Sequence, residues 1–394
     1  MRTHHLHCVK NHYTAVVVGG GPAGSAAAHT LAKSGVEVCV VDRFRFPRQK
    51  LCGGLLTQRA KKNYAAIFGP GWEEMYDYRC NGAKFFDGER LVNSIYNYGE
   101  LYLCDRYRFD ARLIDKARQR GAELVQGERV TAVDLRHRVC KLQSGKEITC
   151  RYLIGADGVN SVVANAIHNG KTSRNGKAFA LEATLPAAAL SRKIAEPEIY
   201  FDSIEWGYGW IFPRNDVVVV GVGGLFSKNR DFRASFNTFY RNRFGSEFAG
   251  VVKGHFVPFG EYSRGMGRDG VLLAGDAAGL VDPITGEGIA YAMQSGWLAA
   301  QSVLEALSGK SKYVNAEYRK RCAEITGELA YAAKIRNFLF SPATRALFIT
   351  ALARSASAPR RYMELMSGEL TYRELLKNSG RKLLRLAADK ITGT

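Results

Sequence analysis

The stretch Tyr13-Thr-Ala-Val-Val-Val-Gly19-Gly-Gly-Pro-Ala-Gly24 decides the fold of this chain. The β-branched run before Gly19 predicts a buried strand, the alanine-rich residues 22–34 predict a helix, and residues 36–41 predict a second buried strand. Together they form a βαβ unit with parallel strands. The glycines follow the G-x-G-x-x-G pattern, which lets the backbone approach a pyrophosphate at the N-terminus of a helix. The sequence therefore predicts a Rossmann-type dinucleotide-binding unit.

An acidic residue follows the second predicted strand at the position that this unit requires. A carboxylate at Asp42 can accept hydrogen bonds from the ribose hydroxyls of an adenosine. From this part of the chain we predict these cofactor-binding residues: Gly19, Gly21, Pro22, Ala23, Gly24, Asp42 and Arg43.

Two later segments also place an aspartate where a predicted strand ends. Asp157 follows the strand near residues 152–154, and Asp276 follows the strand at 270–274. Asp276 can bond the ribityl chain of a flavin, and the helix that begins at Gly288 can stabilise negative charge on the flavin pyrimidine. The three motifs together predict FAD, with a second set of binding residues: Asp157, Gly275, Asp276, Pro283, Gly286, Gly288 and Ile289.

The residue pattern changes between residues 177 and 259, where short aromatic and β-branched segments alternate with predicted turns. This pattern is typical of an antiparallel sheet. We expect an α/β fold with a discontinuous Rossmann-type FAD domain, an inserted antiparallel-sheet substrate domain and a helical C-terminal region. The expected limits are 1–80, 105–180 and 263–310 for the FAD domain, 81–104 and 181–262 for the substrate domain, and 311–394 for the basic helical region.

Composition and charge narrow the function classes. The chain has 46% hydrophobic residues and a formal net charge of +19, about half of it after residue 310. Such a charge predicts attraction to phosphates, an anionic membrane surface or nucleic acid, but no nucleic-acid motif accompanies it. The chain has no apolar run of about 20 residues that could span a bilayer. Without C-x-x-C pairs or a signal peptide, we expect a cytoplasmic protein with reduced thiols.

The three nucleotide motifs resemble those of the glutathione-reductase-type FAD proteins of the aromatic hydroxylase superfamily, over about residues 13–307. The segment Lys50-Leu-Cys52-Gly53-Gly-Leu55 resembles the cysteine-glycine loop of the geranylgeranyl reductase family, although Leu55 replaces a frequent third glycine. The segment Gly207-Tyr208-Gly-Trp210-Ile-Phe-Pro-Arg resembles that family's Y-x-W-x-F-P-[KR] segment. The resemblance implies an FAD-dependent enzyme that reduces prenyl double bonds in a lipid or quinone precursor. It also implies that Cys52, Gly53 and Arg106 lie near the flavin, with a surface arginine as the alternative at position 106.

The candidate catalytic residues are Cys52, Tyr208 and Trp210. Tyr208, Trp210 and Phe212 alternate, so on a strand they share one face, either as a wall for a prenyl chain or as part of the core. The cations that precede Cys52 in the sequence make it a candidate proton donor or redox partner. The alternative is a small buried residue with a packing role only.

Several choices stay open at the level of sequence. A monooxygenase or halogenase of the same superfamily is the main alternative, because Trp206 and Trp210 resemble a halogenase W-x-W-x-I-P segment; a non-catalytic flavoprotein is another. The electron donor is either NAD(P)H or a reduced, acidic ferredoxin-like protein.

The leucines and cations of residues 381–390 suggest docking on the inner face of an anionic membrane. We predict no metal site, although His4, His5, His7 and His12 lie close to Cys8.

Overall fold

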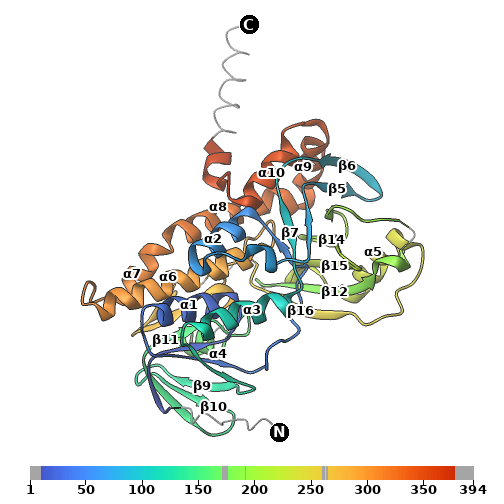
Figure 1. Cartoon of the computed structure of the whole chain (residues 1–394). Helices are drawn as coiled ribbons and strands as arrows, with labels where there is room; N and C mark the ends of the chain where they lie inside the picture. Colours follow the sequence, from blue (N-terminus) through green and yellow to red (C-terminus); the bar gives the residue numbers. More distant parts are fainter. Residues whose placement is uncertain (1–9, 171–175, 191, 260–261, 263–264, 378–394) are drawn as a thin grey trace, which may run out of the picture.

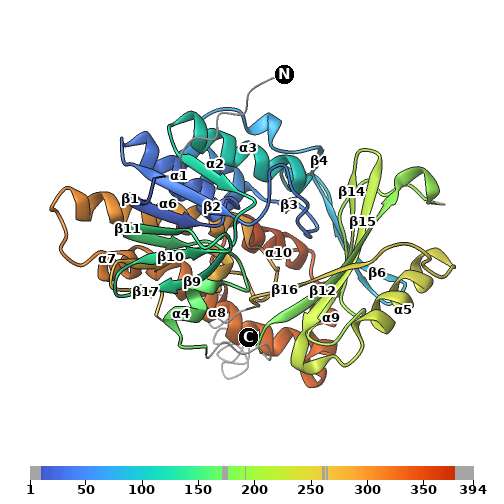
Figure 2. The same cartoon turned by 90° about the horizontal axis from the view of Figure 1, so that it is seen from below.

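The computed structural model describes residues 10–170, 176–190, 192–259, 262 and 265–377. The segment 381–390 and the N-terminal residues His4, His5, His7 and Cys8 lie outside these residues. The described chain forms two sheet-containing lobes side by side, with C-terminal helices lying across both of them (Figures 1 and 2). The predicted α/β fold class is confirmed.

The first lobe is built on the expected βαβ unit. Strand β1 (His12–Val18) pairs in parallel with β2 (Val38–Asp42) on one side and with β11 (Glu147–Gly155) on the other. The sheet order is β17-β18-β11-β1-β2-β8, and β9 and β10 extend it beside β11. The remaining strands are β8 (Glu123–Gln126), β9 (Val130–Asp134), β10 (Val139–Leu142), β17 (Gly267–Arg268) and β18 (Val271–Leu273).

Helices α1 (Pro22–Lys33), α3 (Arg106–Gln119) and α6 (Ile289–Leu307) pack together against this sheet. Helix α3 begins at Arg106. The reason is an N-cap: the Asp105 side chain accepts a hydrogen bond of 2.9 Å from the amide of Tyr107.

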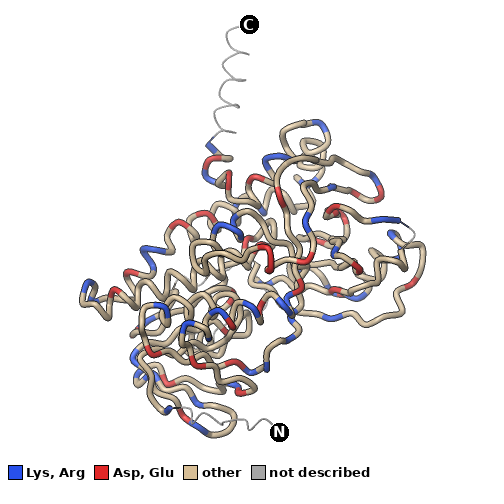
Figure 3. The backbone as a smooth tube through the Cα atoms, viewed as in Figure 1, with Lys and Arg blue, Asp and Glu red and all other residues tan. Residues whose placement is uncertain are grey.

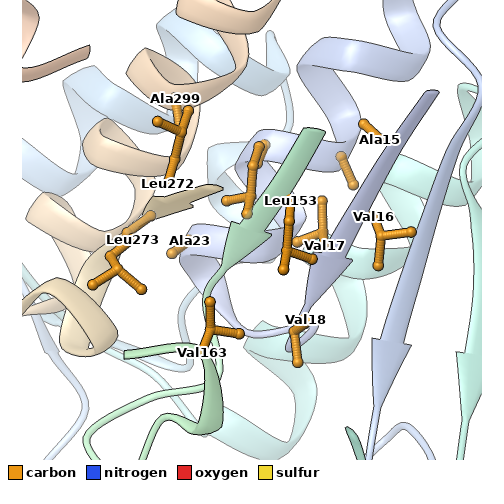
Figure 4. Packing of buried hydrophobic residues seen from close by; sticks show 14 of the residues in the cluster. Ala15, Val16, Val17, Val18, Ala23, Leu153, Val163, Leu272, Leu273 and Ala299 are labelled. Atoms are coloured by element: carbon orange, nitrogen blue, oxygen red, sulfur yellow. The ribbon is translucent and has the colours of Figure 1, made fainter. Parts of the chain in front are cut away.

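The core of this lobe explains why β1 lies at the centre of the sheet. Val16 and Val17 are fully buried, and Leu153, Leu272 and Leu273 from the neighbouring strands are fully buried as well. Figure 4 shows these side chains between the strands and the covering helices. A fully buried valine or leucine contributes about 1.5–3 kcal/mol relative to an exposed one, so an uninterrupted apolar strand is most stable when both of its faces are covered.

The second lobe contains a seven-stranded sheet in the order β16-β12-β15-β14-β13-β5-β6. All neighbouring pairs are antiparallel except β13 and β5, which pair in parallel. The strands are β5 (Ala83–Asp87), β6 (Arg90–Ile95), β12 (Ala178–Pro186), β13 (Glu198–Tyr200), β14 (Gly207–Arg214), β15 (Val217–Leu225) and β16 (Lys253–Val257). The residue limits of the two domains stay a proposal.

Helix α5 (Phe232–Phe244) covers the outer face of the second sheet, although the sequence reading placed only sheet segments in this region. Its buried residues Phe232, Phe236 and Phe239 lie on one side of the helix and pack in one cluster with Val220 of the sheet. The opposite face of the sheet is therefore left to face the first lobe.

The chain after residue 310 is helical where it is described, as expected. Helices α7 (Val314–Arg321), α8 (Ala323–Phe340), α9 (Pro342–Arg354) and α10 (Ala358–Ser367) follow one another, and α9 and α10 contact β6. Among the described helices, none has the length and apolar character needed to cross a membrane. A small third sheet has the strand order β3-β7-β4, with strands Leu55–Leu56, Leu101–Leu103 and Tyr78–Cys80. Two further helices are α2 (Gln58–Phe68) and α4 (Val162–Ile167).

Candidate flavin and substrate site

A cavity of about 510 Å³ lies between the two lobes. One side is formed by the loops that follow β1, β2 and β11, where the carboxyl ends of parallel strands usually bind ligands. The other side is formed by the inner face of the second sheet and by Tyr362 and Met366 of α10.

The glycine loop is shaped for close backbone approach. Gly19 has a φ of +99°, and a Cβ there would lie 2.4 Å from the carbonyl oxygen of Ala156. A Cβ at Gly24 would lie 1.8 Å from the carbonyl oxygen of Gly19, so no side chain fits at either position. Gly21, Pro22 and Ala23 line the cavity at the start of α1. The N-cap residue Gly21 has no side chain, so the first turn of the helix can accept a phosphate.

Asp42 lies at the nucleotide end of the cavity together with Arg43. Its two carboxylate oxygens accept hydrogen bonds from the amides of Gly20 (2.7 Å) and Phe44 (2.8 Å). These bonds hold the carboxylate in place, and each oxygen keeps a lone pair for a ribose hydroxyl.

The aspartates of the other two motifs also line the cavity. Asp157 accepts a bond of 2.7 Å from the amide of Val162 at the start of α4, and burial raises the pKa of its carboxyl group. Asp276, Gly286, Gly288 and Ile289 lie on the same side of the cavity. Three of the described residues predicted to bind the cofactor are not part of the cavity lining: Gly24, Gly275 and Pro283.

The aromatic segment forms one wall of the cavity. Tyr208, Trp210 and Phe212 on β14 all line it, with neighbouring ring centroids 6.0 and 6.4 Å apart. Gly221 on β15 makes room for the indole, because a Cβ there would lie 2.3 Å from the Trp210 ring. Trp210 and Phe212 are also part of the second lobe's core, while a prenyl chain against this wall stays a prediction.

The cysteine loop packs directly on this wall. A Cβ at Gly53 would lie 2.9 Å from the Phe212 ring and 3.3 Å from the indole nitrogen of Trp210. Cys52 is half-buried, and its sulfur accepts a hydrogen bond of 3.4 Å from the amide of Gly54. Lys50 lies 3.4 Å from the His255 ring, and burial lowers the pKa of both groups.

Arg106 is buried, so the alternative of a surface arginine is wrong. It donates two hydrogen bonds, of 2.7 and 2.9 Å, to the fully buried carboxylate of Asp110. Arg48 forms a second ion pair with Asp110 at 2.9 Å. Although burial opposes the effect, the two guanidinium groups lower the pKa of Asp110. Both arginines line the cavity, and the carboxylate holds them there.

Comparisons with known proteins agree with this geometry. Residues 12–205 match the model of the FAD binding domain family. A menaquinone reductase from Mycobacterium tuberculosis is 33% identical over 310 residues, which cover 73% of this chain and 75% of that protein. A digeranylgeranylglycerophospholipid reductase from Methanosarcina acetivorans is 29% identical over 81% of this chain and 82% of its own. The chain belongs to the geranylgeranyl reductase family of FAD-dependent oxidoreductases.

Solved structures show how widely this fold is used. A geranylgeranyl bacteriochlorophyll reductase-like protein from Thermoplasma acidophilum has a TM-score of 0.77 at 20% identity, covering 93% of this chain and 98% of its own. A myxobacterial chondrochloren halogenase has a TM-score of 0.67 at 20% identity, covering 91% and 90%. The fold alone therefore does not separate this geranylgeranyl reductase family member from flavin-dependent halogenases.

The residues of this family member fit the dinucleotide. The side-chain-free turn at Gly19 and Gly24, the open start of α1 and the fixed carboxylate of Asp42 match a pyrophosphate and a ribose. Asp276 and Gly288, at the start of α6, line the same cavity. Within the described residues, no group of three His, Cys, Asp or Glu side chains could hold a metal ion.

Sequence reasoning missed the polar residues that support the loop before α6. Asp282 is buried and accepts bonds from the amides of Ile284 (2.8 Å) and Thr285 (2.9 Å) and from the hydroxyl of Tyr372 (2.8 Å). Glu287 forms an ion pair with Arg59 at 2.6 Å. Burial raises the pKa of the Glu287 carboxyl group, although the positive charge of Arg59 opposes this shift. No local sequence signal could find Tyr372 and Arg59, because these residues are distant in the chain from the loop they contact.

A buried glutamate, Glu182 on β12, was missed as well. It lines the cavity beside the cysteine loop. A lone glutamate in a strand carries no motif, so only the tertiary structure identifies it.

Proposed function

We propose that this protein uses bound FAD to reduce carbon–carbon double bonds of a prenyl chain in a lipid or quinone precursor. The observation that carries the proposal is the continuity of one cavity, in which the nucleotide-binding loops face an apolar wall of Tyr208, Trp210 and Phe212. Reduced FAD supplies a hydride for such a reaction. The relatives named as menaquinone and digeranylgeranylglycerophospholipid reductases support this substrate class.

The residues of the chain have separate tasks in this proposal. The aromatic wall, with Tyr362 and Met366 opposite the nucleotide loops, holds a long apolar chain and excludes water. Gly53 keeps the cysteine loop against the wall, so Cys52 stays beside the reacting part of the chain. Within this loop the Cys52 thiol is a candidate for proton delivery or electron transfer, and the Cys52→Ala variant described below tests proton delivery.

The partners follow from the same chemistry. A prenyl lipid or quinone is held in a membrane, so we propose a cytoplasmic protein that docks on the inner, anionic face of a bilayer. Electrons come from NAD(P)H or from a reduced acidic ferredoxin-like protein, which would suit the +19 charge. Basic and acidic residues are interspersed along the described backbone in Figure 3. This distribution therefore does not indicate where either partner binds.

An anaerobic single-turnover experiment tests the proposal. The protein is reduced with dithionite and mixed with geranylgeranyl lipids or menaquinone, and the flavin spectrum and product masses are recorded. We expect reoxidation of the flavin together with a gain of two hydrogen atoms per reduced bond. If the flavin stays reduced until oxygen is admitted and the product is then hydroxylated or halogenated, the monooxygenase or halogenase function replaces the proposed one.

A further inference from the structure

The inner face of the second sheet carries an acid group in an otherwise apolar and aromatic surface. Among the described strand residues of this sheet that line the cavity, Glu182 has the sole carboxylate. It is 8% exposed, so it is a buried acid and not a solvated surface residue. Buried carboxylates are uncommon unless they are paired or functional.

The register of the strands places Glu182 in one row with the aromatic wall. Glu182 on β12 lies opposite Gly221 on β15, and Gly221 lies opposite Trp210 on β14. Because Gly221 has no side chain, the Trp210 ring occupies the space above it, between the two strands. The indole of Trp210 is therefore the neighbour of Glu182 on the cavity side.

The carboxyl group of Glu182 is only partly satisfied. The backbone amide of Cys52 lies close enough to favour its charged form, which places the carboxyl group beside the cysteine loop. Its oxygen Oε2 is buried and accepts no hydrogen bond from the part of the chain that the structure describes. The charged and titratable groups around it are Lys50 on the loop, Arg214 on β14, and Lys253 and His255 on β16. Despite these cations, none of the described residues forms an ion pair with Glu182.

This environment brings the pKa of the Glu182 carboxyl group close to neutral pH. Burial raises the pKa of Glu182 to about 7, while the Cys52 amide, Arg214, Lys50 and the Trp210 indole act in the opposite direction. A group with a pKa near the working pH is the most effective general acid, because it holds a proton and also releases it readily. A prenyl chain in the cavity would remove water and favour the protonated form further.

We propose that Glu182 is the proton donor of the prenyl reduction, an inference that rests on the proposed function. Reduction breaks the π bond of one alkene and forms two C–H bonds. The electron pair for one C–H bond comes as hydride from the reduced flavin, and the proton for the other leaves the Glu182 carboxyl group. The resulting carboxylate takes a proton from solvent before the next bond is reduced. The backbone amide of Cys52 then stabilises the carboxylate that forms, and the Cys52 thiol takes no part in the proton transfer.

The kinetic test uses the full-length protein with FAD, reduced by dithionite, and a geranylgeranyl lipid in single turnover over a range of pH. For the wild type we expect a constant rate at acidic pH and a fall as the pH rises above about 7, because the acid form is required. Glu182→Gln should lower the rate by about 10²–10⁴-fold and abolish this fall. Glu182→Asp should recover part of the rate with the fall restored, and the exposed control Glu205→Gln should behave as the wild type. A Glu182→Gln protein with wild-type rate and pH profile overturns the proposal.

Two further measurements separate this inference from the proposed function. The first is infrared titration of the protein without substrate: a carboxylic-acid C=O band that titrates near pH 7 should be present in the wild type and absent from Glu182→Gln. If the infrared difference spectrum between the wild type and Glu182→Gln shows no such band, the inference fails even when prenyl reduction is observed. If the band is present but no prenyl bond is reduced, the proposed function fails instead. The second is Cys52→Ala, which should keep the pH-dependent fall; complete loss of proton transfer in this variant would assign the donor to the thiol.

Discussion

The hydroxyl group of Tyr208 donates a hydrogen bond of 2.5 Å to the backbone carbonyl of Thr285. This bond joins the aromatic wall of the second lobe to the loop that leads into α6 in the first lobe. The contact is tight, because Gly286 has a φ of +71° and a Cβ there would lie 2.8 Å from the same hydroxyl oxygen. The aromatic wall and the loop before α6 are therefore held in one arrangement.

Removal of this hydroxyl should loosen the connection without removing the wall. In Tyr208→Phe the ring stays, but the Thr285 carbonyl loses its donor. We expect a loss of about 1–3 kcal/mol in the free energy of unfolding, measured by urea denaturation of the FAD-bound protein. The matched control is Tyr313→Phe, because Tyr313 is 75% exposed. Equal stability of the two variants would show that the bond does not couple the lobes.

The glycine loop should tolerate no side chain. In Gly24→Ala the added methyl group would overlap the carbonyl oxygen of Gly19, at 1.8 Å, so the turn that faces the pyrophosphate must open. We expect purified Gly24→Ala to lack the visible absorption of flavin and to bind added FAD at least about tenfold more weakly, a difference of about 1.4 kcal/mol. Gly327→Ala is the control, because its Cβ on α8 meets no atom within 4 Å. Normal FAD content in Gly24→Ala contradicts the assignment.

The position of the Trp210 ring over Gly221 should matter for substrate binding and not for cofactor binding. In Gly221→Ala the new methyl group would displace the Trp210 ring, which lies 2.3 Å from the added atom, towards the cavity. We expect FAD content to be unchanged while the apparent affinity for a prenyl lipid falls. Calorimetry or flavin fluorescence with increasing chain length measures this effect. Loss of FAD together with substrate binding would point to a general folding defect.

The buried ion pairs of Asp110 predict a pH-dependent contribution to stability. Asp110→Asn leaves Arg48 and Arg106 buried without a counter-charge, so we expect a loss of about 3–5 kcal/mol near neutral pH. Since the pKa of Asp110 is lowered in the folded protein, its contribution is fully present above the unfolded pKa. It should disappear as the pH falls through the folded value.

Urea midpoints of the wild type and Asp110→Asn, measured from neutral to acidic pH, test this relation. The two curves should converge at low pH. A constant difference at all pH values would mean that the carboxylate contributes through packing alone. The exposed pair of Arg118 and Asp115 offers a control, because Asp115→Asn should change stability by no more than about 1 kcal/mol.

Much of the fold was readable from local patterns. The β1–α1–β2 unit, the antiparallel sheet within residues 177–259 and the helices after residue 310 were expected, because each has a periodicity or a turn motif of its own. Helix α5 was missed because its phenylalanines also suit a strand, and packing on the sheet decides between the two. The parallel pairing of β13 with β5 was not predicted either, because it joins segments more than a hundred residues apart.

The sequence by itself determined the cofactor class, the family and the face that Tyr208, Trp210 and Phe212 share, because these depend on residues close together in the chain. Only the tertiary structure decided that Arg106 is buried on Asp110, that Gly53 and Gly221 both pack on Trp210, and that Glu182 lies beside the Cys52 amide. A side chain's burial and charge environment depend on strands and loops that come together only when the chain folds. The nucleotide turn could therefore be read as a motif, whereas the acid that faces the aromatic wall could not.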